Sequence, residues 1–254
     1  MSQPKDSSNG RKPGTKRAPT SVKAKRMPAG AKRAAGASGT TKRGTTRREE
    51  IVRAAAETFY RKGYDATTTQ DIAEAVGMLK GSLYYYISAK EDLLYEIISE
   101  VHEVWANNLK RHEIMDGEPL TRIWAFVHNN VVGNAENLVN SAVFFRDFSA
   151  LTGQRRKHIL ALRDVHDNTL REMIREGQTM GQVRASVDPK VAATGILTMC
   201  NALYHWYRPD GALSVDDVAV QYADLVVSGL ATQTKMLDRA RHEALTQLEA
   251  AASA

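Results

Sequence analysis

The residues best suited to binding chemistry lie in a short predicted helix that begins near Lys80. Leu83 and Ile87 stand four residues apart and can anchor that helix to its neighbours through one face. The remaining side chains point away from this anchor, and they are Lys80, Ser82, Tyr85 and Tyr86. A packed helix of this length would normally use three consecutive tyrosines as core. The pattern therefore favours a helix that presents hydroxyl and ammonium groups to a partner.

A second short helix precedes this one and begins in Thr67–Asp71. Thr68 and Asp71 have the spacing of a capping box, which aligns the free amides of the first turn, and such amides bind phosphate. Gly77 closes the helix, and only two residues separate it from the next one. Two short helices joined by a tight turn after glycine predict a helix-turn-helix, whose second helix enters the DNA major groove. An ordinary three-helix bundle is the alternative.

Two longer helices must hold this unit in place. The first is predicted to begin near Thr46 and to end at Gly63, which suits a C-terminal cap. Its apolar stripe contains Ile51, Ala55 and Phe59. Ser88–Glu91 has the spacing of another capping box and is predicted to open a fourth helix. At ~1.5 Å per residue, about 23 residues make a rod of roughly 35 Å, which can link a DNA reader to a distant pocket.

Helical spacing of apolar residues continues beyond this rod and predicts five more helices. They are expected around Ile123–Val131, Asn137–Leu151, Ile159–Gly181, Asp188–Trp206 and Ser214–Leu230. Strand-type alternation is scarce, so we expect an all-α, nine-helix chain of two domains. The last two helices are apolar around more of their circumference than solvent-facing helices should be. This favours a four-helix dimer interface, the alternative being a monomer whose last helices cap the core.

Charge divides the chain more sharply than its net value of +6 suggests. Residues 1–48 hold fourteen Lys or Arg and one acid, Asp6, so they carry +13 and the remainder carries −7. Residues 1–46 have too few apolar side chains to form a core, and we expect a disordered basic tail that contacts DNA phosphates. A solubilising extension, or a start codon assigned too far upstream, is the alternative. The other expected units are residues 47–91, 92–231 and a C-terminal extension, 232–254.

Several classes of protein are disfavoured by what the sequence lacks. Cys200 is the single cysteine, so the chain can form neither an internal disulfide nor a cysteine-based metal site. The seven histidines are scattered without metal-ligand spacing, and no phosphate loop, nucleophile elbow or paired-carboxylate motif appears. No apolar run is long enough for a membrane span. We therefore expect a cytoplasmic, nucleoid-associated protein that is not an enzyme and has no metal or cofactor.

The helix-turn-helix segment resembles the N-terminal signature of TetR-family transcriptional regulators over about 45 residues. The matching residues are Phe59, Gly63, Thr67-Thr68-Thr69, Asp71-Ile72-Ala73, Val76-Gly77, Gly81-Ser82-Leu83-Tyr84-Tyr85-Tyr86-Ile87 and Lys90-Glu91-Asp92-Leu93. Tyr86 stands where the family often has His, and Ile87 where Phe is common. Both keep the size and the aromatic or apolar character of the usual residue.

The resemblance implies a role in DNA binding for individual side chains. Phosphate contacts would come from Thr68, Thr69, Tyr84, Tyr86 and Lys90. The side chains closest to base edges would be Gln70, Lys80, Ser82 and Tyr85. Lys can donate to guanine and Gln can pair with adenine, so these types suit the task. The last basic pair before the signature, Arg47 and Arg48, would track phosphates as basic arms do.

In TetR-like proteins, helices four to eight surround a cavity for a small-molecule inducer. The candidates on those helices are Trp124, His128, Phe144, Phe145, Phe148, His166, Met173 and Met199. Core packing is the competing interpretation for each of them. A weaker resemblance, carried by Trp206–Gly211 with Tyr222, is to regulators of steroid and fatty-acid breakdown, some of which sense acyl-CoA. The basic run Arg155–Lys157 would then receive CoA phosphates, unless it is a solvated helix end.

These expectations combine into a homodimeric repressor that binds a palindromic double-stranded operator and is released by a small-molecule inducer, with acyl-CoA as the suggested class. Two alternatives stay open. One is a DNA-architectural protein dominated by its basic tail. The other is an activator that needs its ligand in order to bind DNA.

Overall fold

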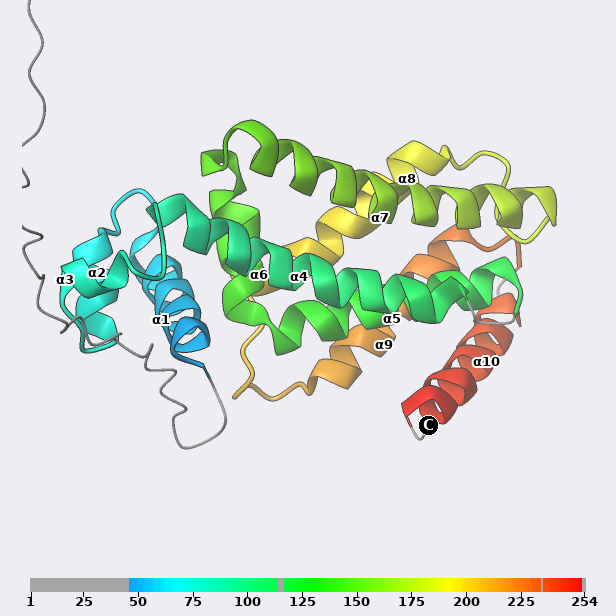
Figure 1. The fold of residues 1–254 in the computed structure, drawn as a ribbon. Helices are drawn as coiled ribbons and strands as arrows, with labels where there is room; N and C mark the ends of the chain where they lie inside the picture. Colours follow the sequence, from blue (N-terminus) through cyan, green and yellow to red (C-terminus); the bar gives the residue numbers. More distant parts are fainter. Residues whose placement is uncertain (1–45, 114–116, 234, 253–254) are drawn as a thin grey trace, which may run out of the picture. The chain divides into compact units, whose positions relative to one another are not determined.

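The computed structural model describes residues 46–113, 117–233 and 235–252, and within them the regular structure is helical (Figure 1). The helices are α1 (Arg47–Lys62), α2 (Thr69–Ala75), α3 (Lys80–Leu83), α4 (Lys90–Glu113), α5 (Pro119–Glu136), α6 (Leu138–Asp147), α7 (Gly153–Thr179), α8 (Pro189–Asn201), α9 (Val215–Leu230) and α10 (Lys235–Ala252), with 3-10 turns at η1 (Phe148–Ala150) and η2 (Ala202–His205). The all-α prediction is confirmed, although ten helices replace the expected nine. In this part of the chain no helix has the length and apolar character needed to cross a membrane.

The first helix begins and ends where the sequence predicted. Thr46 accepts a hydrogen bond from the amide of Glu49, and the Glu49 carboxylate accepts one from the amide of Thr46, which completes a capping box. At the other end the amide of Gly63 donates to the carbonyl of Phe59 over 2.7 Å. Gly63 has a φ of +82°, a conformation that favours glycine.

A Schellman motif produces the tight turn between α2 and α3. Gly77 adopts a φ of +65° and its amide donates to the carbonyl of Glu74, while the amide of Met78 donates to the carbonyl of Ala73. At the start of α2, the predicted capping box of Thr68 and Asp71 is present. The turn fixes where α3 begins, so the helix-turn-helix geometry follows from local backbone chemistry.

The predicted capping box at Ser88–Glu91 is wrong by one residue. α4 begins at Lys90, and the carboxylate that accepts the free amides belongs to Asp92, which lies 2.6 Å from the amide of Ser88 and 2.9 Å from that of Ala89. Because the helix begins later than expected, Asp92 rather than Glu91 occupies its third position. Glu91 is left to contact another helix.

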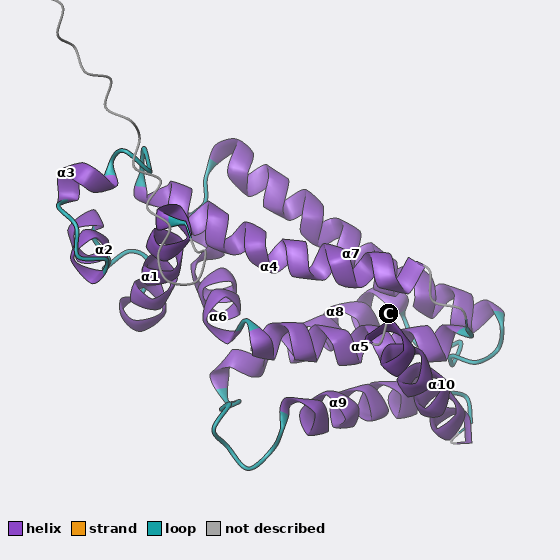
Figure 2. Cartoon of the chain, turned by 60° about the horizontal axis from the view of Figure 1, so that its bottom comes forward, coloured by secondary structure: helices purple, strands orange, loops and turns teal. Residues whose placement is uncertain are grey.

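Two apolar clusters form the interior, and α4 belongs to the first of them. This reader cluster joins α1, α2 and α3 to the first four turns of α4, to α6 and to Ile159 of α7. The second, the body cluster, surrounds α5, which packs against α4, α7, α8, α9 and α10. Figure 2 shows α5 and α9 running side by side. The apolar face of α4 therefore packs against α1, α5, α6 and α7 together.

Two further boundaries differ from prediction. The eighth helix was expected to reach Trp206, but α8 ends at Asn201 and continues only as the 3-10 turn η2. The segment after residue 231, expected only as a C-terminal extension, contains α10, whose Ala240 and Ala244 are buried against the body cluster. Leu237 and Leu248 pack on the same cluster, so the amphipathic pattern of this helix was present in the sequence and was not recognised.

Candidate functional site

The four-residue helix α3 is anchored on one side and exposed on the other. Leu83 and Ile87 are buried in the reader cluster. Tyr85 is 87% exposed, the largest value among the large apolar side chains of the described residues, and Tyr84 is also exposed. Tyr86 is half-buried and packs against the cluster. The helix therefore presents Tyr84 and Tyr85 outward together with Lys80, which makes no ion pair within the described residues.

Hydroxyl and carboxylate groups align the start of α2 beside this helix. The Thr69 hydroxyl lies 3.3 Å from the phenol oxygen of Tyr84 and so links α2 to α3. Thr68 donates to the carboxylate of Asp71 over 2.6 Å. Lys62 donates to the same carboxylate, and these hydrogen bonds, Lys62's first, hold the pKa of Asp71 well below its usual range. Gln70 contacts Glu74 of its own helix over 2.6 Å.

Three basic side chains predicted to bind phosphate make intramolecular contacts. Arg47 donates to the carbonyl of Val76 over 2.8 Å and pairs with Glu50. Arg48 pairs with Glu96 and donates to the carbonyl of Tyr86.

Lys90 donates to the carbonyls of Tyr64 and Thr67 over 2.6 and 2.7 Å, with its ammonium above the Tyr64 ring. These three residues hold the reader together, and only their remaining donor positions can face DNA.

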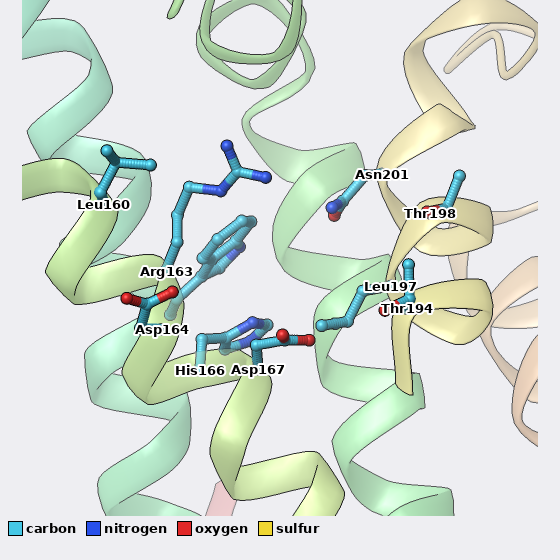
Figure 3. Close-up of a pocket in the computed structure, with 10 residues that line it drawn as sticks. Leu160, Arg163, Asp164, His166, Asp167, Thr194, Leu197, Thr198 and Asn201 are labelled. Atoms are coloured by element: carbon cyan, nitrogen blue, oxygen red, sulfur yellow. The ribbon is translucent and has the colours of Figure 1, made fainter. Parts of the chain in front are cut away.

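A cleft of about 260 Å³ lies between α7 and α8 (Figure 3). Trp105 of α4, which is buried, also lines it. Two polar stripes with helical spacing face each other across it. From α7 come Leu160, Arg163, Asp164 and Asp167, and from α8 come Thr194, Leu197, Thr198 and Asn201. His166 also lines the cleft and is stacked on Trp105, with ring centroids 4.4 Å apart. The cleft thus combines an aromatic floor with polar, solvent-facing walls.

Arg163 supplies the positive charge of this cleft. Its guanidinium lies over two aromatic rings, 5.3 Å from the centroid of Phe148 and 5.9 Å from that of Phe144, and it pairs with no carboxylate among the described residues. Asp167 is neutralised by Arg171 of the same helix. Nearby, burial lowers the pKa of His102 to about 4, with Arg163 and His158 adding to the effect. His102 is therefore neutral at pH 7, and Arg163 can receive an anionic group.

The residues predicted to bind an inducer lie in three different places. His166 lines the cleft, and Phe145 and Phe148 pack in the aromatic cluster behind it. Trp124 and His128 turn the other way, because the Trp124 indole donates to Asp224 and His128 Nε2 lies 2.9 Å from Asp216, both on α9.

Met173 belongs to the body cluster, and Met199 lies on the outer side of α8. The sequence reasoning missed Trp105, Arg163 and the two polar stripes. The residues of the two stripes recur at i, i+3, i+4 and i+7 on the seventh and eighth helices, and this spacing could have identified them as one surface.

The first turns of α7 contact the first turns of α4. Arg155 pairs with Asp92 and, over 3.8 Å, with Glu91. The Glu91 carboxylate also accepts a hydrogen bond of 2.8 Å from the amide of Thr152. Within the basic run Arg155–Lys157, Arg156 lies 4.8 Å from the centroid of the Phe148 ring. Two of the three expected CoA-phosphate ligands therefore make contacts within the chain.

The outer faces of α8 and α9 form an apolar groove of about 300 Å³. Val191 is 71% exposed and Leu225 63% exposed, both on this surface. At Gly195 and Gly229 an added Cβ would meet no atom within 4 Å, so bare backbone is open to an approaching helix. We call this surface the outer groove.

The fold and these sites define a helix-turn-helix regulator with a separate sensing body, and the comparisons give its family. Residues 51–97 match the family of bacterial regulatory proteins, tetR family, and residues 116–230 match the tetracyclin repressor-like C-terminal domain. The chain belongs to the TetR family of transcriptional regulators.

The chain aligns with nearly the whole length of one curated relative and two solved structures of this family. The HTH-type transcriptional repressor KstR2 of Rhodococcus jostii is 28% identical over 73% of this chain and 92% of the relative. The TetR-family regulator PfmR of Thermus thermophilus is 34% identical over 70% of this chain and 96% of that one, with a TM-score of 0.63. AibR in complex with isovaleryl coenzyme A and operator DNA is 28% identical over 72% and 97%, with a TM-score of 0.64. These relatives are regulators, not enzymes.

Proposed function

We propose that the chain is a homodimeric repressor that binds an operator through α3 and leaves it when a small molecule occupies the cleft. The observation that carries the proposal is the outward presentation of Tyr84, Tyr85 and Lys80 on a helix whose opposite side is buried. An exposed tyrosine beside a lysine at the start of a recognition helix can contact phosphates and base edges. Residues 47–91 are the reader in this proposal, and residues 92–231 are the sensing and dimerisation body, which the extension 232–254 covers.

The outer groove supports dimerisation. Two copies of α8 and α9 would cover Val191 and Leu225, and the two glycines let the backbones approach closely. A two-fold dimer places two copies of α3 on successive major grooves, about 34 Å apart on B-DNA, which predicts a palindromic operator. Met199 would then contact the partner instead of the inducer.

The cleft supports an anionic inducer of modest size or a thioester that enters only in part. Ligand pockets usually hold about 300–1,000 Å³, so a volume of about 260 Å³ lies just below this range. An acyl chain can lie against Trp105 and His166 while Arg163 receives a carboxylate or phosphate at the entrance. Isovaleryl coenzyme A, the ligand named for AibR, makes acyl-CoA the first class to test. The solved KstR2 of Mycobacterium tuberculosis is described as a ketosteroid transcriptional regulator. Steroid-derived acids are therefore the second class to test.

Release requires that the inducer bind a DNA-incompetent arrangement more tightly than the operator-bound one. The contact between α7 and α4 supplies the connection. A ligand that separates α7 from α8 would pull on Arg155, which pairs with Asp92 at the first turn of α4. Since α4 packs with α1 in the reader cluster, its movement changes the separation of the two recognition helices.

The decisive experiment selects DNA from a random pool with the purified full-length chain and repeats the selection with isovaleryl-CoA and other acyl-CoA thioesters present. A repressor should select a palindrome, bind it near 10⁻⁸ M and lose it with one of the thioesters. A chain that selects no sequence would contradict the proposal.

Deleting residues 1–45 removes the basic tail and keeps Thr46, which caps α1. Loss of the tail should weaken binding at low salt and leave the preferred sequence unchanged, because a basic arm contributes mainly through phosphates. If sequence-specific binding vanished with the tail, an architectural protein would be the better description. If the ligand were needed for binding, the chain would be an activator.

A further inference from the structure

An exposed leucine precedes the recognition helix. Leu79 is 80% exposed, and among the large apolar side chains of the described residues only Tyr85 of the same segment is more exposed. Leu79 is also the N-cap residue of α3, and its side chain makes no capping hydrogen bond. It therefore combines an unfavourable exposure to water with an unfavourable residue type at the cap.

Four other helices begin with a residue that caps them, since Thr46, Thr68, Asp188 and Ser214 each accept a hydrogen bond from the first turn. Glu118, Asn137 and Thr152 make no such bond at the start of α5, α6 and α7, but all three are polar. A serine or threonine at residue 79 would do the same for α3. A large apolar residue at the cap is best explained by a contact that forms only when α3 meets its partner.

The neighbours of Leu79 indicate that this partner is the edge of a base pair. Lys80 follows it directly and is exposed, Tyr85 is exposed six residues later, and an added Cβ at Gly81 would meet no atom within 4 Å. The N-terminal end of a recognition helix is the part that reaches base edges in the major groove. The apolar feature offered there is the C5-methyl group of thymine. The exposed lysine on the same small surface favours the DNA polyanion over an apolar protein partner.

We propose that Leu79 is a specificity-determining residue that packs on a thymine methyl group in each half of the operator. The inference rests on the proposed operator binding and adds a residue and a base to it. Leu79 supplies no charge, so it selects sequence while leaving the salt dependence of binding to Lys80 and other cations.

Deoxyuridine provides the test, because it differs from thymidine only by the missing methyl group. Each thymine of the selected operator is replaced in turn, and the affinity of the full-length chain is measured by fluorescence anisotropy. We expect one pair of symmetry-related positions, one in each half-site, and at each of them affinity should fall by about fourfold, the factor that corresponds to burial of one methyl group. In Leu79→Ala the same replacement should have no effect.

Two further variants exclude a purely structural effect. Leu79→Ser provides a polar cap, so it should unfold at the same or a higher temperature than the unmodified chain and still ignore the missing methyl. Leu213→Ala shortens an exposed leucine far from α3 in sequence and should keep the fourfold response.

Two results would overturn the inference. One is an unmodified chain indifferent to every thymine replacement, and another is a Leu79→Ala variant that keeps the response. If the chain selected no operator at all, the proposed repressor function itself would be refuted. That outcome differs from a chain that selects an operator but shows no effect of the missing methyl group.

Discussion

The phenol oxygen of Tyr95 lies 2.8 Å from Nδ1 of His158 and joins the second turn of α4 to the second turn of α7. Arg155 lies over the same tyrosine ring, 5.5 Å from its centroid, and pairs with Asp92. Leu160, the first residue of α7 in the cleft, follows His158 by two positions. A single helical turn therefore separates the cleft from the contacts that hold the start of α4.

Arg155→Gln should weaken the response to inducer more than it weakens the fold. The ion pair is partly exposed, so its loss should reduce the free energy of unfolding by less than about 1 kcal/mol. The loss of operator affinity caused by the inducer should shrink by about threefold, because less of the ligand's effect reaches α4. Arg175→Gln, which breaks a pair with Glu172 on the same helix, is the control and should keep the full response. Equal responses in both variants would show that α7 communicates by another route.

Thr198→Trp should fill the cleft while leaving the interior undisturbed. Thr198 is exposed on α8, so an indole can extend over Trp105 and His166 without entering the core. Operator binding without inducer should stay within about twofold, and inducer binding should fall by at least about tenfold in calorimetry. Thr169→Trp, at a half-buried position of α7 outside the cleft lining, controls for the added ring. A variant that still binds the inducer normally would place the inducer site elsewhere.

Leu225→Glu should separate the dimer. The variant puts a charge in the centre of the outer groove, where pairing of two copies would bury it. Sedimentation should show a monomer, and affinity for the palindrome should fall by about a hundredfold or more because only one half-site can bind at a time. Val165→Glu makes the same change at an exposed position of α7 and should remain dimeric. A dimeric Leu225→Glu chain would rule out the outer groove as the interface.

His102 should make the fold sensitive to mild acid. Its pKa is lowered to about 4 by burial, so between pH 4 and about 6.5 the unfolded chain holds a proton that the folded chain does not. Its contribution to stability is complete above about pH 6.5 and declines as the pH falls toward 4, by up to about 3 kcal/mol.

The measurement compares urea unfolding of the unmodified chain with that of His102→Leu. The difference in unfolding free energy between the two should change by this amount between pH 7 and pH 4. If the two chains lose stability in parallel, His102 titrates normally.

Cys200 should be inert while the chain is folded. Its thiol is buried and burial raises its pKa to about 12, so almost no thiolate is present at pH 8. A chromogenic disulfide reagent should label it only as fast as the chain unfolds, and completely in denaturant. Rapid labelling under native conditions would mean that α8 opens locally.

Local chemistry explains why much of the reader could be predicted from sequence. The caps at Thr46 and Thr68 and the turn at Gly77 each depend on residues within a few positions of one another. The one-residue error at Ser88 arose because two acidic residues stand side by side there. A capping pattern cannot by itself decide which of them the helix will use.

The cleft depended on information that a single sequence does not contain. Trp124 and Trp105 are both buried aromatic residues on neighbouring helices, but only Trp105 faces α7. Trp124 is drawn toward α9 by Asp224, a hundred residues away. Which side of a buried helix faces a cavity is decided by such distant partners. The individual DNA-contacting and inducer-contacting side chains therefore remain predictions for the experiments above.

The reader cluster has a practical consequence for anyone exchanging DNA specificities between regulators. Phe144 of α6 and Ile159 of α7 complete the interior that Phe59 and Leu83 begin. Residues 46–91 expressed by themselves would leave that interior open to water and should not fold. A chimaera joined at residue 91 would also need matching residues from its donor where α4, α6 and α7 complete this cluster. The unit that must be exchanged is therefore larger than the motif that touches DNA.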